Sequence, residues 1–298
     1  MSPHIALLVN PASGRRRAAV IAVRLKEALR AAGARVHVYT GRSAADSRRL
    51  ARLAVSDRPD ALVAVGGDGL VHQALQAVVG SGVPLAVVPA GSGNDIARSF
   101  GSRHTSARRT AETILAGRTR SSDVIRLTLP DGGRRYYMSV LACGFDARVN
   151  ERVNGLRFGM GRAGYLYGIV AETRSFDPID FEIDIDGRRI SERGMLVAVG
   201  NTDSYGGGLK MCAGAEPDDG LLDVVLIREA PLSRFVRHFP RILKGSHVEL
   251  EEVRVERGSS VTVRGDAGIA YADGERMGPT PLMCQVVPKA VEMLEPTS

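Results

Sequence analysis

Three glycine-containing segments have the residue types that let a protein backbone bind phosphate. They are Asn10–Gly14 (NPASG), Gly66–Gly69 (GGDG) and Pro89–Asp95 (PAGSGND), and each lies between an apolar run and a helical pattern. Glycine lets backbone N–H groups approach an anion without a Cβ in the way, and the helix that follows presents its positive N-terminal end. An ordinary tight turn is the alternative for each segment taken alone. Asp68 suits a role beside magnesium or water near phosphates, or the N-cap of the next helix.

The elements around these segments predict a parallel sheet. Short apolar runs at 4–9, 35–39, 61–65 and 85–88 are typical of buried strands. Helical spacing of apolar residues appears between and after them, at Arg15–Ala32, Ala44–Ser56, Leu70–Val79 and Ala107–Ala116. Strand and helix alternate, which favours a parallel sheet covered on both faces. Because the carboxyl ends of parallel strands share one edge, we expect the three glycine segments to converge there as a cradle for a polyphosphate.

From about residue 124 the pattern changes to strands and turns. Strands are predicted at Val124–Leu129, Tyr136–Leu141, Phe181–Ile185, Met195–Val199, Leu221–Ile227, Val248–Val255 and Ser260–Val263, with a hairpin turn at Asp186-Gly187. Helical stretches are expected at 164–176 and 231–244. The sequence therefore predicts an α/β domain over residues 1–123 and a mainly antiparallel domain over 124–284. The segment 285–298 either closes the second domain or returns to the first.

Other phosphate-binding signatures fit poorly. A Walker A loop needs a lysine directly after a glycine, and no lysine of this chain follows one. Residues Gly159–Gly164 match G-x-G-x-x-G, but no clear strand leads into them, so an ordinary loop competes with a dinucleotide site.

Composition excludes several classes of protein. The 298 residues are 44% hydrophobic and 24% charged, which excludes collagen-like, disordered and small disulfide-scaffold chains. A net charge of +7 suggests anionic partners. Three widely spaced cysteines without a C-x-x-C pair indicate neither a disulfide framework nor a zinc site. The N-terminus lacks the pattern of a signal peptide and the apolar runs are short, so we expect a cytoplasmic protein with peripheral membrane contact.

The segment 231–244 is a candidate for that contact. Arg234, Arg237, Arg241 and Lys244 recur at helical spacing, with apolar residues on other faces. A basic amphipathic helix can lie on an anionic bilayer, whereas a core-packed helix with a solvated charged face is the alternative. Pro240 is expected to kink this helix. With 5% aromatic residues and no RNA-binding signature, no nucleic-acid partner is expected. A homodimer is left open.

The chain resembles the diacylglycerol kinase catalytic-domain family, and most closely its soluble bacterial lipid kinases, a group related to sphingosine and ceramide kinases. The resemblance is carried by NPASG, GGDG and PAGSGNDIAR, then by YGGGLKMCAGAEPDDGLLDV at 205–224 and ADGE at 272–275. It implies an α/β domain similar to those of NAD kinase and phosphofructokinase, followed by a β-sandwich lipid domain, with ATP in the cleft between them.

The resemblance also implies site residues. Those that would contact ATP are Asn10, Pro11, Ala12, Ser13, Gly14, Thr40, Gly66, Gly67, Asp68, Gly69, Leu70, Val71, His72 and Ser92. A Mg²⁺ would be held by the Asp219 carboxylate with the backbone carbonyls of Glu216 and Leu221, unless this segment is a plain hairpin turn.

Glu275 matches the family's proton acceptor, and Asp68 is a second catalytic candidate. A solvated glutamate beside a turn is the alternative for Glu275. Asp95 and Asp123 are weaker candidates for a water–magnesium network, each able to serve instead as a helix cap or strand-edge charge.

The resemblance implies transfer of the γ-phosphate of ATP to a hydroxyl of diacylglycerol or a related neutral lipid. After GGDG this chain has Leu70, Val71, His72 and Gln73, where most bacterial members have threonine and later Asn-Glu. Leucine and histidine resemble the sphingosine-kinase branch. A sphingoid or ceramide-type lipid kinase, an NAD kinase-like enzyme and a non-catalytic nucleotide-binding protein therefore stay as alternatives.

Overall fold

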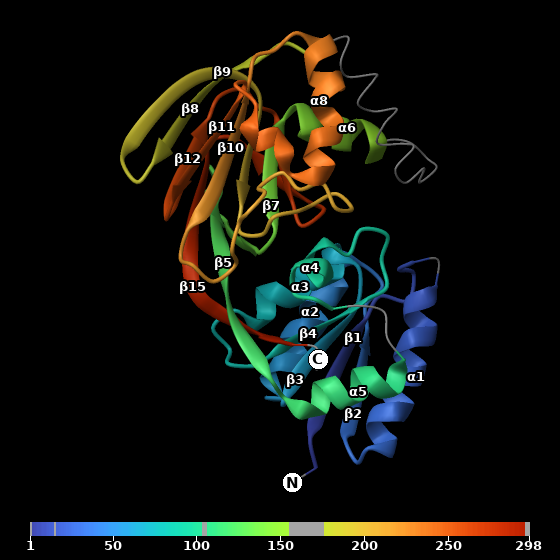
Figure 1. Ribbon diagram of the computed structural model, residues 1–298. Helices are drawn as coiled ribbons and strands as arrows, with labels where there is room; N and C mark the ends of the chain where they lie inside the picture. Colours follow the sequence, from blue (N-terminus) through green and yellow to red (C-terminus); the bar gives the residue numbers. More distant parts are fainter. Residues whose placement is uncertain (1, 15, 103–105, 155–175, 296–298) are drawn as a thin grey trace. The chain divides into compact units, whose positions relative to one another are not determined.

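The chain forms two compact units. A computed structural model describes residues 2–14, 16–102, 106–154 and 176–295 (Figure 1). Unit 1 comprises Met1–Val124 with Pro288–Ser298, and unit 2 comprises Ile125–Val287. The chain passes from one unit to the other within two strands, β5 (Thr119–Thr128) and β15 (Leu282–Leu294). The C-terminal segment therefore contributes to both units.

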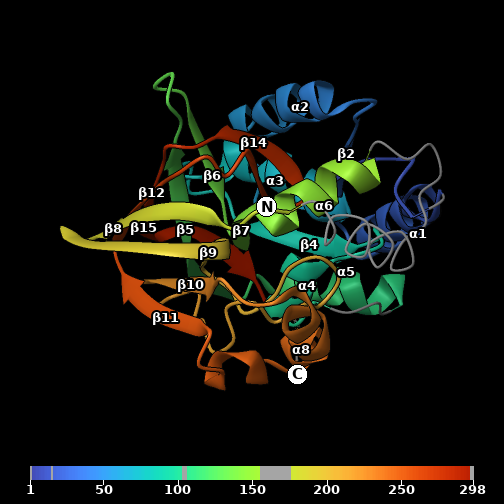
Figure 2. The same cartoon turned by 90° about the horizontal axis from the view of Figure 1, so that it is seen from above.

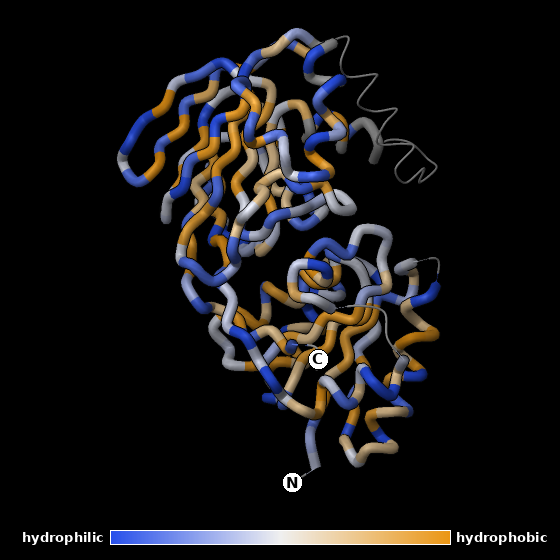
Figure 3. The backbone as a smooth tube through the Cα atoms, viewed as in Figure 1, coloured by the Kyte–Doolittle hydropathy of each residue, from blue (hydrophilic) through white to orange (hydrophobic). Residues whose placement is uncertain are grey.

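A parallel sheet is the centre of unit 1. Its strands are β1 (His4–Val9), β2 (Arg35–Thr40), β3 (Ala61–Gly66) and β4 (Leu85–Pro89), in the order β2-β1-β3-β4. The end of β15 adds a parallel bridge between Met293 and Leu85. Every residue of β1, β3 and β4 is buried, as expected for apolar strands covered on both faces (Figure 3).

Helices cover both faces of this sheet. On one face, α1 (Arg17–Ala31) and α5 (Ala107–Ala116) bury Leu25, Leu29 and Ile114 against the strands. On the other face, α2 (Ala44–Ser56) packs against α3 (Asp68–Val78). A short helix, α4 (Asp95–Ser99), follows β4. The strands and helices predicted in this half agree with the structure to within about two residues at each end.

Unit 2 is mainly antiparallel. Its strands, besides the parts of β5 and β15, are β6 (Arg134–Tyr137), β7 (Val140–Gly144), β8 (Ile179–Ile185), β9 (Arg188–Gly200), β10 (Leu222–Arg228), β11 (Val253–Gly258), β12 (Ser260–Arg264), β13 (Ile269–Ala272) and β14 (Glu275–Pro279). Inward-facing residues of β5 to β10 and of β12 to β15 form one apolar core. Figure 2 shows β8 and β9 as a long hairpin, joined at the predicted Asp186-Gly187 turn. The antiparallel second domain is confirmed.

Among the residues that the structure describes, three helical segments accompany these strands. They are α6 (Phe145–Asn154), α8 (Leu232–Lys244) and the 3-10 helix η1 (Ser246–Glu249). Ile242 of α8 packs in a second apolar cluster with Phe145 of α6. No helix among the described residues is both long and apolar enough to cross a bilayer.

Several predictions for this half are wrong in detail. The strand predicted at Tyr136–Leu141 is interrupted at Met138 and Ser139, whose backbone N–H groups donate to the Asp273 carboxylate instead of a neighbouring strand. The strand predicted at Val248–Val255 begins as η1 and becomes extended only from Val253. Helix α6 was not predicted. The predicted helix at 164–176 and the Gly159–Gly164 motif lie almost wholly or wholly outside the described residues.

Candidate functional site

The three glycine segments of unit 1 meet at the carboxyl edge of its sheet. The Ala90 N–H donates to the Gly66 carbonyl oxygen at 2.8 Å, which joins the second and third segments. A Cβ placed on Gly91 would lie 2.5 Å from the Gly67 Cα, and one placed on Gly14 would lie 2.0 Å from the Ala90 carbonyl oxygen. These approaches leave no room for a side chain. The predicted convergence is therefore confirmed, with glycine required at the contacts.

Helix ends near the cradle are not capped by side chains. Neither α1 nor α3 has a side-chain hydrogen bond at its N-cap, whereas Ser43 and Ser106 cap α2 and α5. The Asp68 side chain lies in the first turn of α3, and its Oδ1 accepts from the Ile96 N–H at 3.0 Å. The N-cap residues of α1 and α3 therefore leave the first N–H groups of these helices without a side-chain cap, and Asp68 is the acidic residue in the first turn of α3.

Asp68 and Asn94 fix the third segment. The bond from the Ile96 N–H to the Asp68 carboxylate caps α4. The sequence suggests Asp68 as a cap of α3, the helix that follows it, whereas its side chain caps α4. Asn94 has φ +56°, and its side chain accepts from the Gly91 N–H at 2.8 Å and donates to the Gly91 carbonyl at 2.9 Å. Asp95 is buried and pairs with Arg98. The loop that carries Ser92 is thus held from both sides.

The first segment is ordered by its own asparagine. Asn10 Oδ1 accepts from the Ala12 N–H at 3.1 Å, and the Asn10 carbonyl accepts from the Ser13 N–H at 3.1 Å. Thr40 is the last residue of β2, is exposed, and lies in register with Val9 immediately before this segment. Ser92 is also exposed. Side chains of Thr40 and Ser92 are therefore accessible at the strand ends where the resemblance places ATP contacts.

Leu70, Val71 and His72 are placed differently. Their side chains are buried within unit 1, with 5%, 1% and 1% of their surface exposed. Leu70 lies against Gly66, where a Cβ would come within 2.6 Å of Leu70 Cδ2. These three residues therefore offer almost no surface to a ligand. Gln73 is buried beside them, and its Oε1 accepts from Arg48 Nε at 2.8 Å.

In unit 2, Glu275 begins β14 directly after a tight turn at Asp273 and Gly274. Asp273 is 3% exposed and has φ +52°, and its carboxylate accepts from the Ser139 N–H at 3.0 Å and the Ser139 hydroxyl at 2.6 Å. A third donor is the Met138 N–H, 3.3 Å from Oδ2. These bonds fix the turn from which Glu275 projects. Glu275 itself is half-buried.

Asp273 was not among the predicted site residues. In the sequence it reads as the first residue of an Asp-Gly hairpin turn, which needs no long-range partner. Its positive φ agrees with such a turn. Its burial and its bonds to a segment 134 residues away depend on the tertiary structure, so the local sequence does not reveal them.

The acidic segment at 216–223 has part of what a magnesium ion needs. Asp219 and Glu216 are exposed, while Asp223 is 6% exposed. Asp219 Oδ1 accepts from the Leu221 N–H at 2.9 Å, and Oδ2 pairs with Arg257, which also lies 3.3 Å from Asp223 Oδ1. Burial raises the pKa of Asp223, and nearby Asp219 and Glu216 add to that effect while Arg257 opposes it.

The Asp223 Oδ2 atom is the feature of this segment that best suits a magnesium ion. Within the described residues this buried oxygen has no hydrogen-bond partner, so it is an orphaned hard ligand of the kind that magnesium prefers. The described residues contain no group of three or more His, Cys, Asp or Glu side chains arranged to hold a metal. A magnesium ion here would therefore depend on backbone carbonyls and one or two carboxylates, as the resemblance implies.

The predicted site residues thus fall into separate groups. Unit 1 brings Asn10–Gly14, Thr40, Gly66–Gly69 and Ser92 to one edge of its sheet. Glu275 and the segment Glu216–Leu221 belong to unit 2. Asp123 serves unit 1, since its Oδ1 accepts from the Lys289 N–H at 2.7 Å and so joins β5 to β15.

Comparison with known proteins agrees with these features. A family model described as the diacylglycerol kinase catalytic domain matches residues 4–127, and one described as the YegS C-terminal NAD kinase beta sandwich-like domain matches residues 139–295. A crystal structure of a diacylglycerol kinase from Bacillus anthracis shares the fold, with a TM-score of 0.78 at 19% identity over 99% of this chain and 97% of that one.

Two relatives extend the comparison in sequence. A diacylglycerol kinase of Mycobacterium tuberculosis (strain H37Rv) is 37% identical over 98% of this chain and 95% of its own length. One from Bacillus subtilis (strain 168) is 25% identical over 86% and 84%. The chain therefore belongs to the diacylglycerol kinase catalytic domain family and is a diacylglycerol kinase-like phosphotransferase.

Proposed function

We propose that the protein transfers the γ-phosphate of ATP to a hydroxyl of diacylglycerol or a related neutral lipid. The observation that carries the proposal is the convergence of three glycine loops, where a Cβ on Gly14 or Gly91 would overlap neighbouring backbone. Such a surface presents backbone N–H groups at close range, which is what a triphosphate requires.

In this proposal unit 1 binds and orients the nucleotide. The turn at Gly67–Gly69 and the N-terminal ends of α1 and α3 face the phosphate oxygens with favourable electrostatics. The first loop contributes its shape, because the Ala12 and Ser13 N–H groups donate to Asn10 within that loop. Asp68 keeps the second and third loops together through its bond to Ile96. Positioning and electrostatics supply most of the rate acceleration in phosphoryl transfer.

Glu275 receives the proton. As the lipid hydroxyl oxygen attacks the γ-phosphorus, a P–O bond forms, the bond to the β-phosphate oxygen breaks with its electron pair leaving on ADP, and the hydroxyl proton passes to the Glu275 carboxylate. Asp273 holds the turn that carries Glu275. A Mg²⁺ at Asp219 and the carbonyls of Glu216 and Leu221, with Asp223 beside it, would supply positive charge to this acidic segment.

A panel of acceptors tests the proposal and separates the alternatives. The protein is incubated with γ-labelled ATP and Mg²⁺, with diacylglycerol, ceramide or sphingosine in mixed micelles, or with soluble NAD. We expect label in a phospholipid from diacylglycerol, at least tenfold above the other acceptors. Label in a sphingolipid or in NADP would assign the enzyme to a different substrate class. Nucleotide binding with no labelled product from any acceptor would refute the proposed catalysis.

A further inference from the structure

A pocket in unit 2 lies between helix α8, the 3-10 helix η1 and the neighbouring ends of β10 and β11. It is open to solvent on one side and encloses about 370 Å³ of space between the atoms, a size that suits a small ligand. Most of its wall is apolar, with side chains from all four elements and from the segment after η1. These side chains belong to Ile227, Phe239, Ile242, Leu250 and Val253.

His247 of η1 gives this apolar wall a hydrogen-bond acceptor. Its side chain is 2% exposed, and its ring Nε2 lies 3.0 Å from the Met211 carbonyl oxygen. Because a carbonyl oxygen can only accept, Nε2 carries the proton of this bond. Burial lowers the pKa of His247 against the opposing effect of the Met211 bond, which favours the neutral ring. Nδ1 is then an acceptor, and among the described residues it has no hydrogen-bond partner.

The other polar residues of the wall leave this nitrogen to a ligand. Arg234 pairs with Glu252 at 2.5 Å, and the Arg234 side chain is 55% exposed, so this ion pair lies toward the solvent side. His238 is partly exposed. A buried water needs about two to four polar partners, which a single ring nitrogen on an apolar wall does not supply.

The chemistry of Nδ1 selects among apolar ligands. A carboxylate or an unsubstituted hydrocarbon chain has no hydrogen to donate, so Nδ1 would stay buried without a partner. An alkylammonium ion has such hydrogens, but its charge would have to enter an apolar wall. A hydroxyl group donates a hydrogen bond and carries no charge.

We propose that this pocket binds an aliphatic alcohol, whose chain packs on the apolar wall and whose hydroxyl donates to His247 Nδ1. The class includes free alcohols and neutral lipids that keep one hydroxyl. Asp223 and Ile227 are four residues apart on β10, so the pocket lies about 13 Å along this strand from the acidic segment. It is therefore a second ligand site, and its occupancy requires neither ATP nor phosphoryl transfer.

Saturation-transfer NMR on the full chain tests the preference for an alcohol. The probes, of similar length, are 1-hexanol, hexyl methyl ether and hexanoate near neutral pH, and only the alcohol can donate a hydrogen bond. We expect 1-hexanol to bind about fivefold more tightly than either of the others. Equal affinities for the three probes would overturn the proposal, since the pocket would then offer an apolar surface alone or hold a water at Nδ1.

Two variants locate the binding. H247F keeps a ring and removes Nδ1, so 1-hexanol and hexyl methyl ether should bind within about twofold of each other. A230F adds a ring at a residue that lines the pocket, and should weaken the binding of both probes at least about tenfold. A45F makes the same change on an exposed part of α2 and should bind as the wild type does. Thermal unfolding checks that each variant is folded.

A soluble short-chain diacylglycerol distinguishes the sources of the alcohol. Displacement of 1-hexanol by dibutyrylglycerol would assign the pocket to neutral lipids, and binding of 1-hexanol without displacement would assign it to free alcohols. A preference for 1-hexanol that survives in H247F, or 1-hexanol binding that survives in A230F, would overturn the proposal. A protein that binds 1-hexanol as expected but phosphorylates no acceptor would refute the proposed catalysis and leave this inference standing.

Discussion

The carboxylate of Asp273 determines the position of the turn before Glu275. It is buried, it accepts from two backbone N–H groups and one hydroxyl, and no single oxygen of a shorter side chain could serve all three donors. Removing it would leave buried N–H groups of Met138 and Ser139 without an acceptor, which is the costly direction of losing a hydrogen bond. A residue outside the predicted site thus controls the geometry of a residue within it.

We expect D273A to lower the free energy of unfolding by about 2–4 kcal/mol, because both the buried donors and the left-handed turn lose their support. Urea unfolding measures this. Asp131 provides the control, since it is exposed and accepts only a local bond from the Gly133 N–H at 2.8 Å. D131A should cost about 1 kcal/mol or less. Equal losses in the two variants would mean that the Asp273 bonds add nothing.

Glu275 is expected to act on the proton alone. E275Q keeps the size and hydrogen-bonding capacity of the side chain but cannot accept a proton, so kcat should fall by about 10²–10⁴. The Kd for ATP, measured by isothermal titration with the same protein, should stay within about twofold of wild type. A variant with wild-type kcat would exclude Glu275 as the proton acceptor.

At the scale of elements, the cradle depends on loops that touch through glycine. Gly14 has φ +57°, and a Cβ there would overlap the Ala90 carbonyl oxygen. We expect G14A to weaken ATP binding at least tenfold, because the first and third loops must separate. Isothermal titration measures the affinity.

Gly80 is the matched control for that variant. It has φ +72° at the end of α3 but open space where its Cβ would lie, so G80A carries only the backbone strain. It should lose some stability and keep its ATP affinity. If G80A weakened ATP binding as much as G14A, general strain would account for the effect and loop contact would not.

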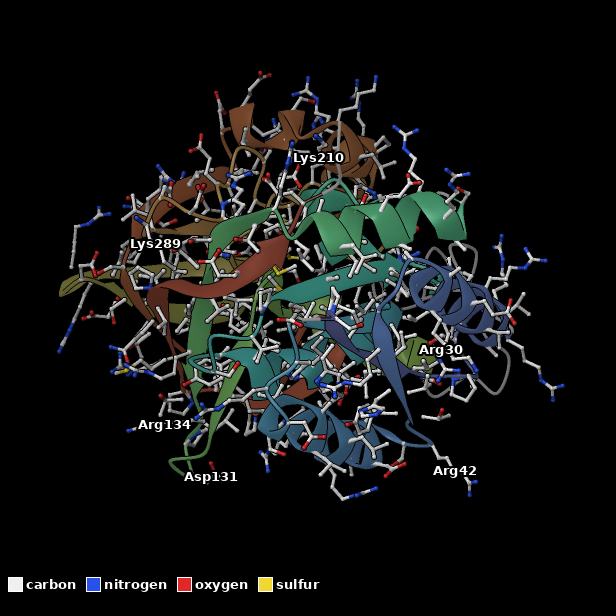
Figure 4. All side chains as sticks on the ribbon, turned by 90° about the horizontal axis from the view of Figure 1, so that it is seen from below. Arg30, Arg42, Asp131, Arg134, Lys210 and Lys289 are labelled. Carbon is white, nitrogen blue, oxygen red and sulfur yellow. The ribbon has the colours of Figure 1, made fainter. Side chains whose placement is uncertain are left out.

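An ion-pair network on the strands of unit 2 makes stability depend on pH. Glu192 on β9 accepts from Arg228 Nε at 2.6 Å and pairs with Arg254, and the two guanidinium groups, Arg228 first, lower the pKa of this carboxyl against the effect of burial. Arg228 and Arg254 thus differ from arginines such as Arg42 and Arg134, whose side chains point away from the protein (Figure 4). A carboxyl with a lowered pKa stabilises the fold above its unfolded pKa, and that contribution is lost as the pH falls through the folded pKa.

We therefore expect E192Q to be less stable than wild type by about 1–2 kcal/mol at pH 7, with the difference shrinking to near zero as the pH falls below about 4. Thermal unfolding across that range measures the difference. Glu229, which pairs with Arg193 at 3.3 Å with both side chains about half exposed, gives a control that should change little. A pH-independent difference for E192Q would contradict the ionic explanation.

Sequence patterns predict the first half of the fold better than the second, for physical reasons. Strands such as β1 and β3 are short, apolar throughout and bounded by glycine or proline, so their burial on both faces is visible in the sequence. The break between β6 and β7 comes instead from a carboxylate more than 130 residues away. No local pattern records such a contact.

The candidate site divides in the same way. The glycine loops are predictable because strand order alone brings their ends to one edge. Which side chains face that edge is not, and Leu70, Val71 and His72 turn inward because α3 packs tightly on α2 and the sheet. Similarly, Asp219 pairs with Arg257 while Asp223 keeps a buried orphaned oxygen, a distinction that depends on the β10–β11 pairing.

At the scale of the whole molecule, the two units have different tasks in the proposed reaction. Unit 1 contributes the nucleotide cradle, and unit 2 contributes Glu275 and the acidic segment. Both crossings of the chain between the units are strands, which also belong to the sheets on either side. The contribution of each unit can therefore be measured in the intact chain, from the change at that unit's own residues when a ligand binds.

Amide hydrogen exchange, read by mass spectrometry with and without ATP and Mg²⁺, tests most directly whether the three glycine loops hold the triphosphate. Segments that contain residues 10–14, 66–69 and 91–94 should all gain protection together, at ATP concentrations that match the measured Kd. The exposed β5–β6 turn at Asp131–Gly133 should not change. Protection of one loop alone, or of none while ATP is bound, would contradict a common phosphate cradle.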